Sequence, residues 1–544
     1  MGEKILLQRR GNAVICLLAG TAAVALAATY YNRNRLSKRA HNDQQSAKLQ
    51  QLLAEYREAL HIPADLLRTI RDDMVKQMNA TLSGKEHSPL LMLPSMVDEL
   101  PNGFESGDFF ALDMGGTNFR TVYVKLSDKH GEMDELKMDE FPIEDSMHHV
   151  PADELFDFMA GKLVAFADRI GKKPKSGSMP VVGFCFSFPL QQTSVNHGTL
   201  IKWNKGFTNP NAVDKDPTDL LEAALARQGM QATVMSLVND TVATLAACRY
   251  QDQDTMLGVI LGTGSNGAYV ECSERVHNAS KKLPPGTNMI INCEWGNFTT
   301  AALPMIDEDK GIDADSVNPE NQHFEKMTAG LYMGEIARRI ILRLAEECGL
   351  FGRRIPTGLQ AQGSLTTPQM SKIDHDMSTD LLSTADVLQE AFGLAVDQIT
   401  LESTQVVQEI CHLVGWRAGR LKSIGISAVM RQLDRDDGTR TVVGVDGGVF
   451  EHYGHYREAM KEGLSEIMGK KAADSVVFRH VNDGSSLGAA YLAAAAVRVD
   501  SPRDSEGSQN DWEKENRGLQ KGPSTPNKTG GKKSKNGGSP NGTD

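Results

Sequence analysis

Residues 109–126 read FFALDMGGTNFRTVYVKL, and this stretch predicts a strand, a tight turn and a second strand. The first strand is apolar and brings Asp113 to its end. Gly115 and Gly116 follow, and glycine permits a sharp reversal that leaves backbone N–H groups accessible. Such a turn can bind phosphate oxygens, and a nearby carboxylate can hold the hydration shell of Mg²⁺, which keeps several waters in proteins. The stretch therefore predicts a phosphate-binding turn beside a metal-holding aspartate.

The same design recurs further along the chain. Residues 255–271 read TMLGVILGTGSNGAYVE, and residues 441–453 read TVVGVDGGVFEHY. A single glycine-rich turn is weak evidence, because ordinary β-turns use the same residues. Repeated turns of this chemistry, each at the end of an apolar strand, predict two related domains that hold one nucleotide between them.

The remainder of the body alternates strand-like and helical stretches, which predicts the α/β class. The predicted strands are Phe109–Met114, Phe119–Lys125, Val181–Phe188, Thr233–Val238, Thr255–Leu261, Ala268–Glu271 and Thr441–Val445. The predicted helices are Glu154–Ile170, Thr241–Arg249, Phe324–Cys348, Leu401–Ile424 and Gly488–Arg498, with a polar helical pattern before them over about Gln44–Ala80.

Length, charge and cysteine use limit the class of protein. The chain has 544 residues, enough for two or three hydrophobic cores. Its net charge of −12 argues against nucleic-acid binding by the body. The seven cysteines are odd in number and form no CxxC motif, which predicts free, buried thiols in a reducing compartment.

The two ends of the chain differ from the body. Residues 11–32 carry no charge, and basic residues flank them on both sides, which favours a membrane-spanning signal anchor. A cleaved secretory signal, with Ala25-Leu26-Ala27 as its cleavage motif, and an Ala-rich disordered start are the alternatives. The tail beyond residue 498 is rich in Gly, Ser, Asn, Pro and Lys, and we expect it to be disordered.

One carboxylate interrupts an apolar run. Residues 237–247 read LVNDTVATLAA, with Asn239 and Asp240 between a predicted strand and a predicted helix. An aspartate in this place can cap the helix. It can equally serve as a general base that takes a proton from a hydroxyl group.

Taken together, these motifs resemble the hexokinase family, and its plant type most closely, over about residues 45–497. The resembling stretches are LDMGGTNFR (112–120), FSFPLQQTS (186–194), GTLIKWNKGF (198–207), VNDTVATLA (238–246), LGTGSNGAYVE (261–271), INCEWGNF (291–298), NPENQHFEK (318–326), GVDGGVFEHY (444–453) and NDGSSLGAAYLAAA (482–495).

The resemblance implies a two-lobed, actin-like ATPase clamp with a duplicated ribonuclease-H-like core. The smaller lobe would comprise residues 99–238 and 485–497, and the larger lobe residues 41–98 and 239–484. A hexose would bind between the lobes with ATP beside it, and lobe closure would exclude water, a competing phosphate acceptor. Residues 1–40 would be the anchor, on the cytosolic face of an organelle membrane. The mitochondrial outer membrane is the favoured location and the plastid envelope the alternative, with the body acting as a monomer.

The resemblance also implies roles for individual residues. Asp240 would be the catalytic base, and Lys205 would contact the transferring phosphate. The sugar contacts would be Ser187, Asn204, Lys205, Asn239, Asp240, Asn266, Glu294 and Glu325. The phosphate contacts would be Asp113, Gly115, Gly116, Thr117, Asn118, Arg120 and Thr263, with Gly447, Gly448 and Gly484 near the nucleoside and Asp113 holding Mg²⁺ through water. Glu325 could instead be a solvated helix residue, and Arg120 a surface residue of its strand.

Several positions depart from the family's pattern. Asn204 replaces a threonine, Gly267 replaces an alanine, and three glycines are replaced by Ala243, Glu320 and Ser486. Added bulk at a close-approach point typically costs about 1–3 kcal/mol. Two hypotheses therefore stand: an ATP-dependent kinase for glucose, fructose or mannose, and a hexokinase-like protein that binds sugar, phosphorylates it poorly and acts as a sensor.

Overall fold

The computed structural model describes residues 30, 31, 33, 35, 43–86, 88–116, 118–175, 177–203, 205–352 and 354–500. The predicted anchor over residues 1–40 lies almost wholly outside this set, as do Thr117, Asn204 and the predicted tail beyond residue 500. No helix among the described residues is long and apolar enough to cross a membrane.

The first glycine-rich turn lies in a sheet that, within the described residues, has five strands in the order β4-β3-β2-β5-β8. β2 and β3 form the predicted hairpin and pair antiparallel, while β2, β5 and β8 run parallel. The strands are β2 (Gly107–Met114), β3 (Asn118–Leu126), β4 (Met133–Pro142), β5 (Val181–Phe186) and β8 (Thr233–Val238). A short hairpin, β6 (Leu190–Ser194) and β7 (His197–Leu200), follows β5.

The second and third glycine-rich turns lie in the other large sheet of the described chain, ordered β1-β11-β10-β9-β12-β13. Its strands are β1 (Leu93–Pro94), β9 (Thr255–Leu261), β10 (Ser265–Cys272), β11 (Asn288–Asn292), β12 (Thr441–Asp446) and β13 (Val476–His480). β9 and β10 form the second predicted hairpin. The third turn leads from β12 into a helix rather than a strand.

The two sheets repeat one topology. In each, an antiparallel three-stranded meander is followed by two parallel strands, so that β2-β3-β4-β5-β8 corresponds to β9-β10-β11-β12-β13. The predicted α/β class and the duplicated actin-like core are confirmed by this repeat.

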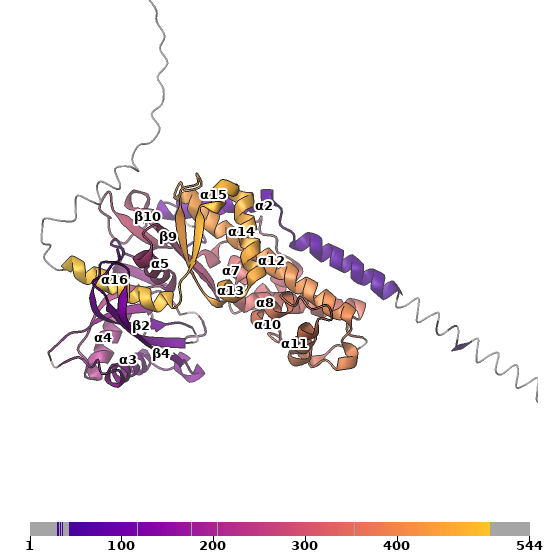
Figure 1. The fold of residues 1–544 in the computed structure, drawn as a ribbon, viewed down its shortest axis with the longest axis horizontal. Coiled ribbons are helices and arrows are strands. Elements are labelled where there is room, and N and C mark those ends of the chain that lie inside the picture. Colours follow the sequence, from indigo (N-terminus) through magenta and orange to yellow (C-terminus); the bar gives the residue numbers. More distant parts are fainter. Residues whose placement is uncertain are drawn as a thin grey trace, which may run out of the picture. The chain divides into compact units, whose positions relative to one another are not determined.

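Three hydrophobic clusters fill the spaces around the sheets. One face of the five-stranded sheet packs against α3 and α4 (Figure 1). Its other face shares a cluster with α5, α16 and one face of the six-stranded sheet. The remaining face of the six-stranded sheet packs against α2, α7, α8, α12 and α14. Helices α5 and α16 therefore lie in the core that joins the two sheets.

The helices are the following. Residues 43–60 are helical, followed by α2 (Ala64–Leu82), α3 (Ala152–Arg169), α4 (Pro217–Arg227), α5 (Asp240–Gln251), α6 (Asp307–Asp315), α7 (His323–Thr328), α8 (Gly330–Cys348), α9 (Thr357–Gln360), α10 (Thr367–Asp374), α11 (Leu382–Phe392), α12 (Leu401–Gln432), α13 (Gly448–His452), α14 (Gly454–Met468), α15 (Lys470–Asp474) and α16 (Gly484–Asp500).

Two helix predictions are wrong in their continuity. The stretch Phe324–Cys348 breaks at Ala329, whose ψ of 154° is extended, into α7 and α8. The break lets Gly330 and Leu331 donate backbone hydrogen bonds to the carbonyl oxygens of Gly262 and Thr263, both at 3.0 Å. The helical pattern over Gln44–Ala80 also breaks, before Pro63, because proline cannot supply the N–H that a continuous helix needs.

Candidate active site

Asp240 is the first residue of α5, at the carboxyl end of β8. Asn239 caps this helix, because its side-chain oxygen accepts from the Thr241 N–H at 3.0 Å. The Asp240 carboxylate accepts from the same N–H at 2.8 Å. Burial raises the pKa of Asp240, while the positive charge of Lys205 opposes that rise. Asp240 is thus both part of the helix start and a carboxylate of increased basicity.

Ser187 and Lys205 lie beside Asp240. Ser187 is buried directly after β5, and its N–H donates to the Met114 carbonyl oxygen at 3.2 Å. Lys205 has a positive φ of 54°, and its ammonium donates to the Ser187 carbonyl oxygen at 2.9 Å. Electrostatic interactions connect Lys205 with both Asp240 and Glu294. The ammonium of Lys205 is therefore positioned to stabilise a negatively charged group that binds beside Asp240.

Asn266 and Glu294 belong to one hydrogen-bonded network. The Asn266 amide donates to Asn292 at 2.8 Å and to Glu294 at 3.2 Å, and it lies 3.4 Å from the Thr241 hydroxyl. Asn292 donates to the same Glu294 oxygen at 2.9 Å. Burial raises the pKa of Glu294, although the hydrogen bond from Asn292 opposes it. These side chains present polar edges of the kind that bind sugar hydroxyls.

Glu325 lies on α7 and is not the solvated helix residue of the alternative interpretation. Both of its oxygens accept from the Ser265 N–H at 3.1 Å. Burial raises the pKa of Glu325 to about 7, against the opposing charge of Lys422. Lys422 is itself fully buried on α12, with its ammonium 4.2 Å from the centre of the Phe324 ring.

The first glycine-rich turn is tight, as predicted. Gly115 donates to the Asn118 carbonyl oxygen at 3.1 Å, and a methyl group on Gly116 would lie 3.0 Å from Cδ of Lys205. The Asn118 amide donates to Glu140 on β4. The side chain of Lys205 therefore packs against this turn at Gly116.

Asp113 is buried at the end of β2 and is surrounded by donors. The hydroxyls of Ser485 and Ser486 donate to one of its oxygens at 2.6 and 2.8 Å. Arg120 lies 3.6 Å from the same oxygen and 3.3 Å from Glu140. Burial disfavours the charge of Arg120, but the two carboxylates together raise its pKa. Arg120 thus faces the site rather than the surface alone.

A second carboxylate, Asp446, faces the same region from the end of β12. It accepts from the Gly484 N–H at 3.1 Å. Burial raises the pKa of Asp446 to about 6, and the negative charge of Asp113 adds to this rise. Asp113 lies at the end of β2 in one sheet and Asp446 ends β12 in the other, and the first turn of α16 donates hydrogen bonds to both carboxylates.

The other predicted nucleotide contacts lie at the second and third turns. Thr263 is exposed at the tip of the β9–β10 hairpin, and its carbonyl oxygen accepts from Leu331. Gly447 has a φ of 114°, and a methyl group there would lie 2.5 Å from the Leu261 carbonyl oxygen. A methyl group on Gly448 would meet only the His452 ring, at 3.7 Å, which leaves its backbone approachable.

Five residues of the site were not predicted from the sequence, and one of them is Ser485, which donates to Asp113. Asp446 stood in a quoted motif, and its position at a strand end, like that of Asp113, was the available signal. Asn292 stood in the motif INCEWGNF without an assigned role. Thr241 and Lys422 carried no local signal, since their roles depend on contacts with Asn266 and Glu325 from distant segments.

The departures from the family's pattern lie at close contacts. Ala243 is buried, and its backbone faces Gly488 of α16 so closely that a methyl group there would lie 1.7 Å from the Ala243 carbonyl oxygen. Gly267 faces Trp295, where an added methyl group would lie 2.5 Å from the ring. Glu320 is exposed with a positive φ of 64°.

Comparison with known proteins identifies the family of the chain. Two family models, both described as Hexokinase, match residues 52–250 and 256–495. Hexokinase-2 of Solanum tuberosum is 40% identical over 486 residues, which cover 88% of this chain and 97% of the relative. Hexokinase-1 of Spinacia oleracea is 39% identical over 492 residues, which cover 89% and 97%.

Solved structures agree with the sequence comparison. The hexokinase of Schistosoma mansoni complexed with glucose superposes with a TM-score of 0.73 at 32% identity, covering 82% of this chain and 99% of that one. A further hexokinase crystal structure gives a TM-score of 0.70 at 29% identity over the same shares. With both sheets, the glycine-rich turns and the matched length in agreement, the chain belongs to the hexokinase family.

Proposed function

We propose that the chain transfers the γ-phosphoryl group of ATP to the 6-hydroxyl of a hexose such as glucose, fructose or mannose. The observation that carries this proposal is the meeting of Asp240, Lys205 and the Asn266–Glu294 network at the ends of related sheets. A catalytic carboxylate, a phosphate-binding cation and sugar-binding polar groups are the parts that such a transfer needs.

The reaction follows from the placement of these groups. Asp240 takes the proton of the 6-hydroxyl as the hydroxyl oxygen forms its bond to the γ-phosphorus. The bond from that phosphorus to the bridging oxygen of ADP breaks, and ADP leaves. Lys205 stabilises the negative charge on the transferring group, while burial makes Asp240 a stronger base than an exposed aspartate.

The residues around Asp113 fit a magnesium ion. Mg²⁺ is usually held by one or two carboxylates together with waters and substrate phosphates. Asp113 and Asp446 are two such carboxylates; burial raises the pKa of Asp446 and the negative charge of Asp113 adds to that rise, and a bound cation would favour the ionised form of both. When bound, Mg²⁺ would neutralise charge on the β- and γ-phosphates of ATP.

The decisive experiment compares the unchanged chain with Asp240→Asn in a coupled assay of glucose phosphorylation. We expect kcat to fall by roughly 10²- to 10⁴-fold, the usual contribution of a general base. Glucose binding should change little. Asp216→Asn is the matched control, because it makes the same substitution at the cap of α4, a helix that packs on the five-stranded sheet. Equal turnover in the chain and in Asp240→Asn would refute the proposed role of Asp240.

A second candidate function rests on Ser486. Its hydroxyl occupies an Asp113 oxygen that the hydration shell of Mg²⁺ would otherwise use. A protein so constrained could bind sugar and turn it over slowly, as a sensor does. Ser486→Gly distinguishes the two candidates, since a hydrogen bond to a charged group contributes about 1.5–3 kcal/mol, or roughly tenfold or more in rate. Turnover that rises by this factor from a very low level favours the sensor, and unchanged turnover favours the kinase.

The N-terminal segment is proposed to anchor the body, as a monomer, to the cytosolic face of an organelle membrane. The mitochondrial outer membrane is the first choice and the plastid envelope the alternative. The uncharged stretch over residues 11–32, with basic residues before and after it, supports membrane anchoring. Residues 1–40 fused to a fluorescent protein should collect at that membrane, and a diffuse signal would contradict the proposal.

A further inference from the structure

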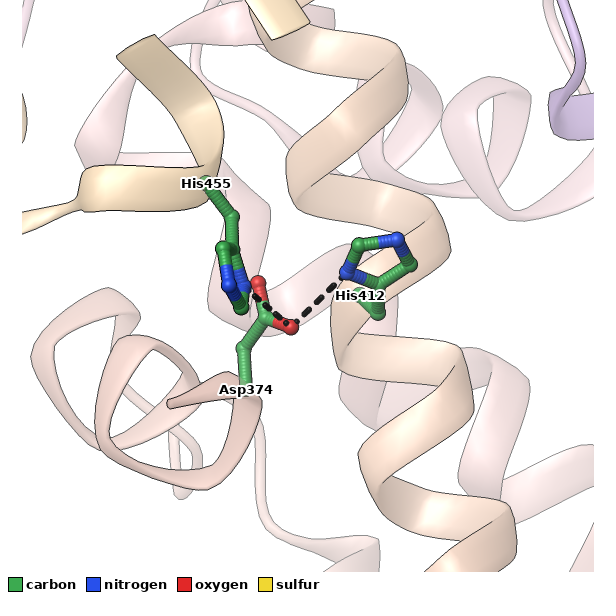
Figure 2. A group of neighbouring side chains, drawn as sticks. All are labelled: Asp374, His412 and His455. Atoms are coloured by element: carbon green, nitrogen blue, oxygen red, sulfur yellow. Dashed lines mark hydrogen bonds and ion pairs between the residues drawn. The ribbon is translucent and has the colours of Figure 1, made fainter. Parts of the chain in front are cut away.

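A cluster of two histidines and an aspartate lies on the helical side of the larger sheet and has no part in the proposed reaction. Figure 2 shows Asp374, His412 and His455 pointing toward one another from three helices. Asp374 ends α10, His412 lies on α12, and His455 lies in the first turn of α14. We propose that these three side chains bind a zinc ion.

The distances between the donor atoms are close to those of a metal site. Nδ1 of His412 and Nδ1 of His455 each lie 3.0 Å from the same Asp374 oxygen. Four tetrahedral ligands at about 2.0–2.2 Å from zinc are roughly 3.3–3.6 Å apart. All three donor atoms lie within 4.8 Å of one another, so side-chain adjustment could bring them to the spacing of ligands around one ion.

The hydrogen bonding of the cluster is incomplete without a further partner. His412 makes a hydrogen bond with Asp374, but the contact from His455 Nδ1 lacks hydrogen-bond geometry, and that buried nitrogen has no other partner among the described residues. The second Asp374 oxygen, Oδ2, is likewise buried without a hydrogen-bond partner in the described chain. The Tyr453 hydroxyl donates to the Cys411 carbonyl oxygen at 3.3 Å, and it also lies close enough to Asp374 to interact with that carboxylate. Asp374 is only 4% exposed, so water does not readily replace the missing partner.

Neighbouring rings fix the orientation of the donors. The His375 ring stacks on the His455 ring with centres 4.4 Å apart and an angle of 16° between the planes. His375 is in turn held by the Ser371 carbonyl oxygen, 2.7 Å from its Nδ1. On the other side, the His412 ring lies 5.3 Å from the Trp416 ring. These ring contacts restrict the rotation of the His412 and His455 side chains.

The donor types exclude hard cations and favour transition-metal ions, among which we propose zinc. Two imidazole nitrogens and one carboxylate oxygen suit Zn²⁺, whereas Mg²⁺ and Ca²⁺ prefer sites made of oxygen alone. Three protein ligands leave a fourth position for water or another ligand. An ion here would tie α10 and α12 to α14, which follows directly on the Gly447–Gly448 turn and α13.

The test uses the full chain, freed of metal by chelation, and titrates it with Zn²⁺ in a calorimeter. We expect one tight site per chain, and Co²⁺ in its place should give the visible absorption bands of a four-coordinate ion. His412→Gln should weaken Zn²⁺ binding by about 100-fold or more, since even residues that only support metal ligands contribute 10- to 100-fold. Asp374→Asn should act in the same direction. Because Asp374 is buried and that variant could fail to fold, the half-exposed His412 carries the test.

The matched control is His197→Gln. His197 belongs to the other described group of metal-capable side chains, together with Asp216 and Asp219, of which Asp219 is exposed. Zinc binding that persists at full strength in His412→Gln would overturn the proposal. So would the absence of a saturable site in the unchanged chain, or a loss of binding confined to His197→Gln.

Discussion

Asp240 shows how one side chain serves both the fold and the chemistry. The cap of α5 comes from Asn239, so the helix would keep a cap if the Asp240 carboxylate were removed. The sequence predicted both possible roles but could not separate them, because a cap and a base stand at the same point between strand and helix. The structure adds the interactions of Lys205 and Glu294 with Asp240 from other segments, and these favour the proposed catalytic role.

Glu320 gives a prediction about stability at a single residue. Its φ of 64° is left-handed, which costs a residue with a side chain about 1–2 kcal/mol and glycine far less. Its N–H, which donates to Asp313 at 2.9 Å, is unaffected by the side chain. Glu320→Gly should therefore raise the free energy of unfolding by about 0.5–1 kcal/mol, after the larger entropy of glycine in the unfolded chain is allowed for.

Urea unfolding measures this change as a higher midpoint at an unchanged slope. Glu458→Gly is the control, since Glu458 is exposed within the helix α14, where glycine should destabilise by about 1 kcal/mol. A loss of stability in Glu320→Gly equal to that of the control would contradict the expected relief of strain.

The buried pair Glu325 and Lys422 predicts a pH dependence of sugar binding. Burial raises the pKa of Glu325 to about 7. An ionised carboxylate accepts hydrogen bonds from sugar hydroxyls through both oxygens, whereas a protonated carboxyl group has less acceptor capacity. Glu325 is mainly protonated below pH 7 and mainly ionised above it. Glucose affinity should thus increase as the pH rises from 6 to 8, by at most about tenfold per pH unit.

Lys422→Met tests the partner in this pair. The charge of Lys422 lowers the pKa of Glu325, so its removal should move the midpoint of the affinity profile to higher pH and weaken binding at pH 7. Tryptophan fluorescence can follow the binding, because Trp295 lies 5.4 Å from the Lys422 ammonium. Lys461→Met, on the exposed side of α14, should leave the profile in place. Identical affinity profiles in both variants would show that Lys422 does not set the pH dependence of glucose binding.

At the scale of elements, seven apolar strands could be predicted from the sequence, whereas β1, β4, β6, β7, β11, β13 and the helix boundaries could not. Each predicted strand lies within a strand of the structure, except that Val181–Phe188 overruns β5 by two residues, because a short apolar run bounded by turn residues is a local signal. The break at Ala329 depends instead on Gly262 and Thr263, some seventy residues earlier in the chain. The contact of Asp446 with Gly484 also joins distant segments, although the strand end that holds Asp446 was visible in the sequence.

The contact between α8 and the second glycine-rich turn predicts a coupled loss of function. A methyl group on Gly330 would lie 2.6 Å from the Gly262 carbonyl oxygen and 2.9 Å from Val449. Gly330→Ala should displace the turn, destabilise the fold by about 1–3 kcal/mol and raise KM for ATP. Gly161→Ala is the control, since its added methyl group would meet nothing nearer than 3.9 Å inside α3 and should stabilise the helix. An unchanged KM for ATP in Gly330→Ala would show that the second glycine-rich turn does not contribute to nucleotide binding.

At the scale of the whole described molecule, α16 connects the parts of the site. Its first turn donates to Asp446 through Gly484 and to Asp113 through Ser485 and Ser486. Further along, Ala489 accepts from the Ser236 hydroxyl of β8 at 2.9 Å. The helix therefore contacts both sheets and both carboxylates, and it lies in the cluster that joins the sheets.

Gly488→Ala is expected to disturb stability and catalysis together. A methyl group at residue 488 would lie 1.7 Å from the Ala243 carbonyl oxygen, so α16 would have to move away from α5. We expect a loss of about 3 kcal/mol, at the upper end for overpacking, because backbone rather than a flexible side chain opposes the new group. Any shift of α16 also moves the donors to Asp113 and Asp446, so kcat should fall in the protein that remains folded. Unfolding in urea and glucose phosphorylation at low denaturant measure the two effects on one sample, with Gly161→Ala again as the control.

Destabilisation with full turnover would mean that α16 supports the core without positioning the carboxylates. The connection between the two sheets and the site would then have to run through β2 and β12 themselves.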